Sequence, residues 1–204
     1  MERNENHYHF LVYKPYGYLS QFVNNQTKRS NNKLLGELYD FPDKIMAIGR
    51  LDKDSEGLLL LTTDGKISDY ISSCKVEKEY YVQIDGIITQ KAIEKLNQGV
   101  EISLPAYSAG LEGTKYITKP CKAHILDSIP KFPERGKKIR DDRHGPTSWI
   151  SITLREGKFR QVRKMTATLG FPTLRLVRMR IGKFKINQLK AGEILEVDNL
   201  FMDK

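Results

Sequence analysis

The sequence is poor in the residues that form disulfides and metal sites. Only two cysteines occur among 204 residues, Cys74 and Cys121, and they form no C-x-x-C motif. Isolated cysteines of this kind are typical of reduced thiols in a cytosolic protein. The four histidines are widely scattered, and no cofactor-binding motif is present. The sequence therefore predicts no disulfide framework, no zinc site and no cofactor.

Long hydrophobic runs are also missing. Purely apolar runs reach only four residues, as at 58–61, whereas a helix needs about 20 to cross a bilayer. The first ten residues, MERNENHYHF, contain no apolar segment typical of a secretory signal. With 39% hydrophobic and 29% charged residues, the composition is that of a soluble globular protein. We expect a cytoplasmic protein with no membrane contact and a single domain over residues 1–204.

Acidic residues are absent from one long segment. Between Lys158 and Lys190 there are ten lysines and arginines and no aspartate or glutamate, in a chain of net charge +9. The rest of the chain is therefore close to neutral, at −1. A one-sided basic field favours a polyanionic partner such as nucleic acid. A solvated basic surface that serves only solubility is the alternative.

Hydrophobic periodicity and turn residues predict a chain of mixed helices and strands. Residues 112–148 contain four prolines and little periodicity, so an irregular segment is expected there. The polar, asparagine-rich segment 24–33 is predicted to be a surface loop. The predicted strands cover 7–14, 57–63, 79–86, 148–156 and 173–184, a final hairpin covers 186–198, and the predicted helices cover 34–39, 65–73, 90–99 and 160–169.

The order of these elements indicates the fold class. Strands outnumber helices, and the regular strand-helix-strand spacing of a parallel sheet is missing. We therefore expect an α+β fold with a mainly antiparallel mixed β-sheet core flanked by helices. Asp64 and Thr89 are the predicted N-caps of two helices, and Gly99 is the predicted end of the second.

The segment GRLDKDSEGLLLLTTDG, residues 49–65, crowds carboxylates into one stretch of a basic chain. Its D-x-D-x-E-G pattern, starting at Asp52, imitates the beginning of a calcium-binding EF-hand loop. That loop requires a bidentate carboxylate at its twelfth position, which here is Thr63. The flanking segments also lack a pair of amphipathic helices. The pattern therefore excludes an EF-hand.

The four leucines behind this loop predict a buried strand, which places Asp52 at the edge of a strand. Arg50 and Leu51 precede it, so we expect a carboxylate and a guanidinium at the edge of the hydrophobic core. This arrangement suits a catalytic carboxylate, and a structural turn is equally compatible with the spacing. Asp54 and Glu56 are expected to be solvated turn residues.

Residues 49–65 resemble the signature G-R-L-D-x-x-[ST]-x-G-L-[LM]-[LIV]-[LIVMF]-[ST]-[NST]-[DNST] of the pseudouridine synthases related to the small-subunit rRNA enzyme. Three further segments resemble motifs of this family, in the family's order: YKPYGYLSQF (13–22), KEYYVQIDG (78–86) and EGKFRQVRKMTATLGFPTLRLVRMRIG (156–182). The resemblance covers most of the chain. Tyr13 departs from the pattern, because the family usually has asparagine before Lys-Pro.

The resemblance implies the pseudouridine synthase catalytic fold and the isomerisation of uridine to pseudouridine, a reaction that needs no cofactor or metal. It implies that Asp52 is the essential carboxylate, that Arg163 pairs with it, and that Tyr80 stacks on the target base. Each residue also has a structural alternative. Arg163 would equally suit a phosphate contact, and Tyr80 a cross-strand aromatic pair. Tyr80 and Tyr81 must point to opposite faces of a strand.

Further basic residues are candidates for substrate and RNA contacts. Arg178 and Arg180 are two residues apart in a predicted strand, so they are expected to project from one RNA-facing surface; pairing with acidic residues is the alternative. Lys14 is a candidate for phosphate binding, unless Lys14-Pro15 merely forms a turn. The complete set of candidates is Arg50, Lys14, Arg160, Lys164, Arg178 and Arg180.

The resemblance also implies a substrate. The Lys-Pro motif begins near residue 14, so we expect no S4 RNA-binding domain ahead of it and a place in the S4-less branch of the family. The expected partner is rRNA, and specifically large-subunit (23S) rRNA, bound by a monomer. A pseudouridine synthase acting on tRNA and a non-catalytic rRNA-binding or assembly factor are the alternatives.

Overall fold

The computed structural model describes residues 7–23, 32–73, 76–106, 113–135, 137–139, 142–186 and 189–201. The chain forms two compact units. Unit 1 consists of residues 1–76 and 178–204, and unit 2 of residues 77–177. The single domain expected over residues 1–204 stays a prediction. Cys74 and most of the predicted surface loop, residues 24–31, lie outside the described residues.

Unit 1 is built on a sheet with the strand order β13-β1-β5-β11. Strand β1 (His9–Lys14) pairs antiparallel with β13 (Ile194–Val197) and with β5 (Glu56–Thr62). Strand β4 (Met46–Ile48) pairs with β5, and β12 (Phe184–Lys185) pairs with β11 (Thr173–Ile181). The prediction of a final hairpin over 186–198 is therefore wrong, because β13 pairs with the first strand of the chain. Residues 187 and 188 of that segment lie outside the described residues.

The two central strands of unit 1, β1 and β5, are buried along their whole lengths. On one face, Phe10 and Leu59 belong to a hydrophobic cluster that also contains Leu35, and Phe41 packs against it. Leu35 begins the short 3-10 helix η1 (Leu35–Glu37), so the helix predicted over 34–39 is a single turn. Strands β2 (Tyr18–Leu19) and β3 (Lys33–Leu34) form a small parallel pair.

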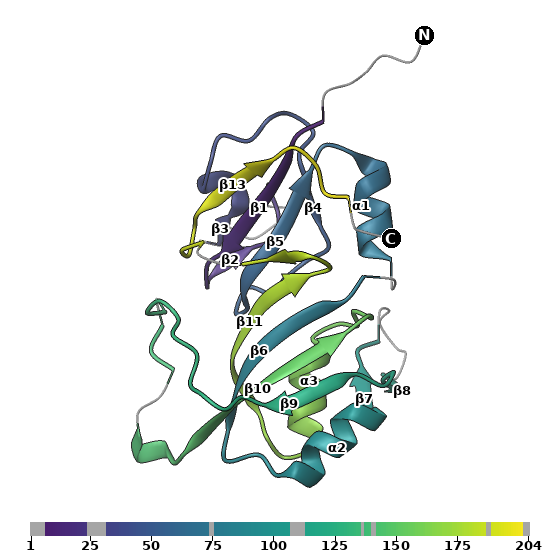
Figure 1. The fold of residues 1–204 in the computed structure, drawn as a ribbon, viewed down its shortest axis with the longest axis vertical. Coiled ribbons are helices and arrows are strands. Elements are labelled where there is room, and N and C mark those ends of the chain that lie inside the picture. Colours follow the sequence, from purple (N-terminus) through teal and green to yellow (C-terminus); the bar gives the residue numbers. More distant parts are fainter. Residues whose placement is uncertain are drawn as a thin grey trace. The chain divides into compact units, whose positions relative to one another are not determined.

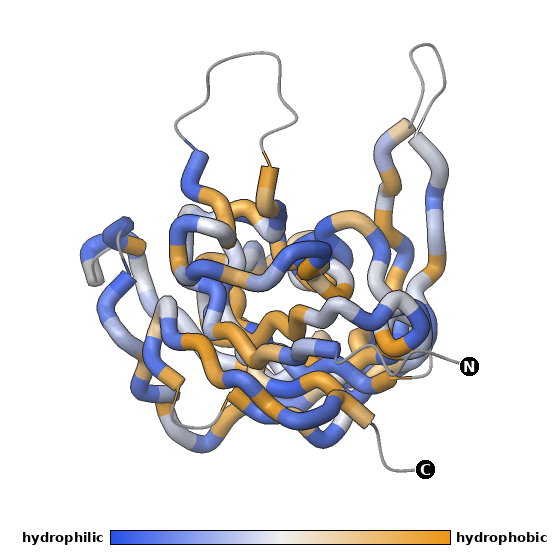
Figure 2. Tube along the Cα trace, turned by 90° about the horizontal axis from the view of Figure 1, so that it is seen from above, coloured by the Kyte–Doolittle hydropathy of each residue, from blue (hydrophilic) through white to orange (hydrophobic). Residues whose placement is uncertain are grey.

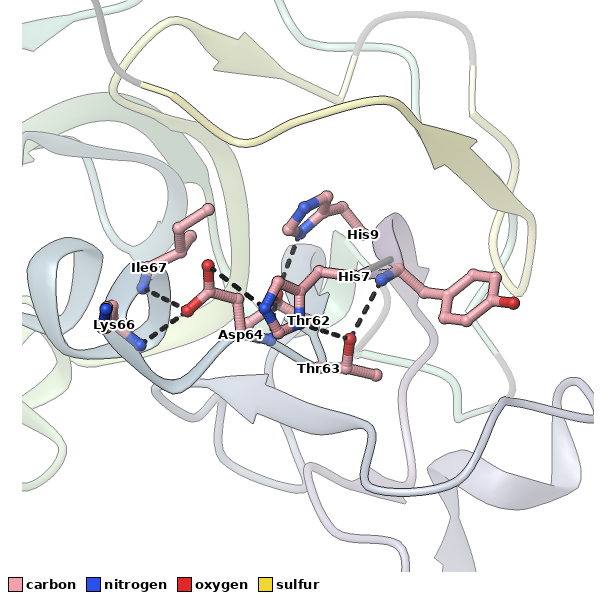
Figure 3. Close-up of polar contacts among 8 residues, drawn as sticks. His7, His9, Thr62, Thr63, Asp64, Lys66 and Ile67 are labelled. Atoms are coloured by element: carbon pink, nitrogen blue, oxygen red, sulfur yellow. Dashed lines mark hydrogen bonds and ion pairs between the residues drawn. The ribbon is translucent and has the colours of Figure 1, made fainter. Parts of the chain in front are cut away.

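The helix of unit 1, α1 (Gly65–Ser72), begins at the predicted cap. A carboxylate oxygen of Asp64 accepts hydrogen bonds from the amides of Lys66 at 2.8 Å and Ile67 at 3.3 Å (Figure 3). Such a cap stabilises a helix by about 1 kcal/mol. In the same corner, Nδ1 of His9 lies 2.8 Å from the hydroxyl of Thr62, which joins the start of β1 to the end of β5.

Unit 2 contains a sheet with the order β11-β6-β10-β9. Strand β10 (Thr147–Leu154) pairs antiparallel with β6 (Lys78–Asp85) and β9 (Lys122–Ile125). Strands β7 (Glu101–Leu104) and β8 (Thr114–Ile117) pair antiparallel in a separate two-stranded sheet. The expectation of an irregular segment over 112–148 is therefore wrong, since β8, β9 and the 3-10 helix η2 (Asp142–His144) lie within it. Both strands are four residues long and mostly exposed, so they carry little hydrophobic periodicity.

Helices α2 (Gln90–Gln98) and α3 (Gln161–Thr168) supply the core of unit 2. Their apolar residues, including Leu96 and Met165, pack with Val82 of β6 in one hydrophobic cluster. The predicted cap of α2 is confirmed, because the hydroxyl of Thr89 accepts the amide of Ala92 at 3.3 Å. Helices packed against mostly antiparallel strands confirm the expected α+β class.

Hydrophobic and hydrophilic residues alternate over short intervals along the Cα trace (Figure 2). Within the part of the chain that the structure describes, no helix is both long and apolar enough to span a membrane. The same described residues contain no group of three or more side chains placed to bind a metal. Burial raises the pKa of the Cys121 thiol to about 11, as expected of an unreactive cysteine.

Candidate active site

Asp52 lies in the loop that leads into the buried strand β5. The backbone on either side of it is held by the segment that follows β1. The Ser20 hydroxyl donates a hydrogen bond to the Leu51 carbonyl at 2.9 Å and accepts one from the Leu51 amide at 3.0 Å. On the other side, the Gly17 amide donates to the carbonyl of Lys53 at 2.8 Å. Two separate contacts therefore restrain the backbone on both sides of the partly buried Asp52, as a preorganised site requires.

Lys14 holds the segment that contacts the Asp52 loop. Its ammonium donates to the carbonyls of Pro15 at 2.9 Å and Tyr18 at 2.8 Å. The side chain has no exposed surface. The geometry therefore favours the alternative in which Lys14-Pro15 forms a turn, and it does not support a phosphate contact by Lys14.

The carboxylates of the acidic loop act electrostatically on this buried lysine. Burial lowers the pKa of Lys14 to about 7, because water no longer solvates the ammonium. The carboxylate of Glu56 counteracts this shift most strongly, Arg178 adds to it, and Asp54 and Asp52 oppose it. Glu56 is itself 3% exposed, so it is not the solvated turn residue that was expected. The acidic loop of this basic protein thus lies close to two buried cations.

Arg178 lies in the core of unit 1 and not on an open surface. Its side chain is 2% exposed, and its Nε donates to the Leu58 carbonyl at 2.6 Å. Arg180, two residues along β11, is partly exposed and donates to the carbonyl of Gly182 at 2.8 Å. The expected RNA-facing surface therefore does not include Arg178, because neighbouring chain covers this part of β11. Arg50 is exposed.

Tyr80 lies in β6 of unit 2, opposite Ile152 of β10. It packs against the cluster that contains Met165 of α3. Tyr81 lies beside Phe132, with the ring centroids 6.4 Å apart, and Phe132 is not part of that cluster. The two tyrosines therefore point to opposite faces, as predicted. Tyr80 shares its face of the sheet with α3, the helix that carries Arg163.

The turn before α3 is organised by a buried carboxylate. Glu156 is 4% exposed and accepts hydrogen bonds from the Tyr116 hydroxyl at 2.6 Å and the Lys119 amide at 2.9 Å. The side-chain amide of Gln161 also donates to Glu156, while its oxygen accepts the amide of Lys158 at 2.9 Å. These hydrogen bonds link the beginning of the turn 156–161 to its end.

The predicted site residues thus fall into two groups. Unit 1 holds Asp52 with Lys14, Arg50, Arg178 and Arg180, and unit 2 holds Tyr80 with Arg160, Arg163 and Lys164. The pairing of Asp52 with Arg163 and the stacking role of Tyr80 stay predictions.

Sequence reasoning missed Ser20, Gly17 and Glu156, which act through nonlocal hydrogen bonds. Their only sequence signal is their position within or beside the family motifs.

Comparison with known proteins identifies the family. The family model for RNA pseudouridylate synthase matches residues 7–168. The chain belongs to this family, and its class of activity is therefore that of an RNA pseudouridine synthase. The structure resembles a crystal structure of a pseudouridylate synthase with a TM-score of 0.71 and 26% sequence identity, covering 97% of this chain and 73% of the other.

Curated bacterial relatives are similar over most of the chain. The ribosomal large subunit pseudouridine synthase E of Vibrio parahaemolyticus is 40% identical over 186 residues, which are 90% of this chain and 71% of the relative. The protein of the same name from Xanthomonas axonopodis is 36% identical over 181 residues, or 88% of each chain. The resemblance found in the four sequence motifs therefore extends over most of the chain.

Proposed function

We propose that this enzyme converts a specific uridine of large-subunit (23S) rRNA into pseudouridine. The observation that carries the proposal is the similarity to two relatives named for that activity, which covers 88–90% of this chain. The acid-free basic segment between Lys158 and Lys190 is consistent with a polyanionic substrate. An rRNA substrate implies a cytoplasmic location. We propose that the enzyme acts there as a monomer, without a cofactor.

In this reaction the bond between N1 of the base and C1′ of the ribose breaks. The base turns, C5 bonds to C1′, and the proton lost from C5 is balanced by one gained at N1. We propose that Asp52 is the carboxylate that makes this possible, by attack on the sugar or the base or by proton abstraction. Each of these routes needs an ionised carboxylate in a fixed position. The contacts of Ser20 and Gly17 with the Asp52 loop support such a position.

The roles of the other two residues follow from the chemistry at Asp52. Arg163 is proposed to keep Asp52 ionised, because a nearby guanidinium lowers the pKa of a carboxyl by about 1–3 units. Tyr80 is proposed to stack on the target base, a contact typically worth about 1–3 kcal/mol. The position of Tyr80 on the face of the sheet that carries α3 supports a joint role with Arg163.

The test is to incubate unmodified 23S rRNA and a tRNA mixture with the purified protein and to map pseudouridine by carbodiimide chemistry. We expect one modified site in 23S rRNA and none with Asp52→Asn. Asp69→Asn, in the exposed part of α1, is the matched control and should remain active. Modification of tRNA alone would contradict the substrate, and tight binding without modification would favour the non-catalytic rRNA-binding factor.

A further inference from the structure

Phe159 is a partly exposed aromatic residue in the turn before α3. It lies between β10 and α3, and 51% of its surface is exposed. The ammonium of Lys164 lies 5.1 Å from the centroid of this ring. The next residue, Arg160, has φ +52° and ψ +36°, a left-handed conformation that is uncommon for residues other than glycine. Such backbone outliers cluster at functional sites.

The turn that carries Phe159 is held by hydrogen bonds at both of its ends. The Gln161 amide donates to the Lys158 carbonyl at 3.0 Å, and the Lys158 amide donates to the Gln161 side chain. Gln161 is in turn bound to the buried carboxylate of Glu156. The backbone that carries the ring is therefore held in place before any ligand arrives, which lowers the entropy lost on binding.

The surroundings of the ring are cationic and fixed. Lys164 donates to the carbonyl of Ser103 at 2.6 Å, which holds its ammonium over one face of the Phe159 ring, so a stacked base would use the opposite face. Lys158 lies over the ring of Tyr116, 4.7 Å from its centroid. Partial burial lowers the pKa of Lys164, and the positive charge of Arg160 lowers it further. The repulsion between like charges decreases when an anion binds between or beside them.

We propose that Phe159 is a base-stacking residue on which an unpaired base of the RNA lies, while Arg160 and Lys164 contact the phosphates beside that base. An aromatic face combined with positive charge is the arrangement by which proteins hold single-stranded nucleic acid. The proposal rests on RNA as the ligand of the proposed function. It adds a contact to a nucleotide other than the target uridine, for which Tyr80 is proposed.

A short single-stranded RNA that carries one 2-aminopurine tests the stacking directly, because stacking quenches this fluorescent base. Phe159→Ala should weaken binding by about 5- to 150-fold and reduce the quenching. Phe159→Tyr keeps a flat ring and should bind like the unchanged protein. Phe201→Ala is the matched control, since Phe201 is 65% exposed but lies beside Asp198 and Asn199. Thermal melting of each variant confirms that the fold is intact.

A second experiment assigns the contact to one base. Single abasic nucleotides are placed in turn around the target uridine of the rRNA fragment. One abasic position should weaken binding to the unchanged protein and have no further effect on Phe159→Ala, because both changes remove the same stacked pair. The slope of log affinity against log salt should stay unchanged for Phe159→Ala, and fall by about 0.7 for Lys164→Met.

Two results would overturn the proposal. One is a Phe159→Ala variant that binds as tightly as the unchanged protein and retains its response to every abasic position. The other is an equal loss of affinity for the tyrosine and alanine variants. Failure of the proposed function is a separate result, in which the unchanged protein forms no pseudouridine in rRNA although the 2-aminopurine quenching still depends on Phe159.

Discussion

Ser20 and Leu51 are joined by two hydrogen bonds, because the Ser20 hydroxyl both donates to the Leu51 carbonyl and accepts the Leu51 amide. The two residues are 31 positions apart in the sequence, and the contact is buried. Leu51 directly precedes Asp52, so this contact restrains the backbone of the proposed catalytic residue. A single hydroxyl thereby links the segment after β1 to the loop before β5.

Ser20→Ala should lower both stability and catalysis. It leaves the buried amide and carbonyl of Leu51 without their partner, which costs about 1–3 kcal/mol per unsatisfied group. We expect a lower free energy of unfolding in urea and a reduced kcat with little change in KM, since Asp52 is mispositioned. Ser73→Ala, which removes an exposed hydroxyl bound to the Tyr70 carbonyl, is the matched control. Normal kcat and stability in Ser20→Ala would show that the contact does not restrain the loop.

Gly57→Ala should destabilise unit 1 strongly. Gly57 has φ +108°, and an added Cβ would lie 2.4 Å from the carbonyl oxygen of Arg178. The strand must move apart from β11 or the backbone must change, and we expect a loss of more than about 2 kcal/mol in the free energy of unfolding. Gly65→Ala is the control, because nothing lies within 4 Å of its added Cβ. Equal melting temperatures for the two variants would contradict this close approach.

Lys14 should make stability depend on pH. Its pKa is about 7 in the folded protein and 10.5 ordinarily, so the unfolded chain binds more protons between these values. The free energy of unfolding should therefore rise as pH increases from about 7 to about 10, and reach its lower limit below pH 7. Lys14→Met should remove this rise, whereas Lys66→Met, at an exposed position in α1, should retain it. Urea unfolding at a series of pH values measures the effect. A rise that persists in Lys14→Met would assign it to another group.

Arg163→Ala should impair catalysis far more than binding. Loss of one preorganised charged group at a reacting centre typically reduces the rate by about 100- to 1,000-fold. Single-turnover kinetics should show this loss, while RNA affinity should change by less than about threefold. Arg163→Lys should recover only part of the rate, because an ammonium lacks the planar fork of a guanidinium. Weak binding with normal turnover at saturation would instead make Arg163 a phosphate contact.

Arg178 and Arg180 should behave differently despite their spacing. Arg178→Met should lower the melting temperature and leave the salt dependence of RNA affinity unchanged, because its guanidinium is buried and bound to Leu58. Arg180→Ala should reduce the slope of log affinity against log salt by about 0.7–0.9, if its partly exposed side chain contacts a phosphate as predicted. A reduced slope in Arg178→Met would show that this part of unit 1 opens to admit RNA.

The sequence by itself determined the features whose physical causes are local. The start of α1 at Asp64 and of α2 at Thr89 depends on side-chain bonds to amides two or three residues away. The buried strand β5 follows from four successive leucines. The family motif around Asp52 was readable for the same reason, since it requires particular residue types in one continuous stretch. Fold class and family could therefore be predicted before any contact between distant segments was known.

Only the tertiary structure decided the features that depend on which distant segments meet. The sequence pattern predicts the same solvent-facing surface for Arg178 and Arg180, yet Arg178 is buried against β5. The sequence leaves two roles open for Lys14, a phosphate ligand or part of a turn. In the structure its ammonium donates to two backbone carbonyls, which favours the turn. The pairing of β13 with β1 was likewise unpredictable, because strand pairing joins backbone groups of any sequence separation. Burial and strand pairing depend on the whole folded chain, and the identity of a single residue determines neither of them.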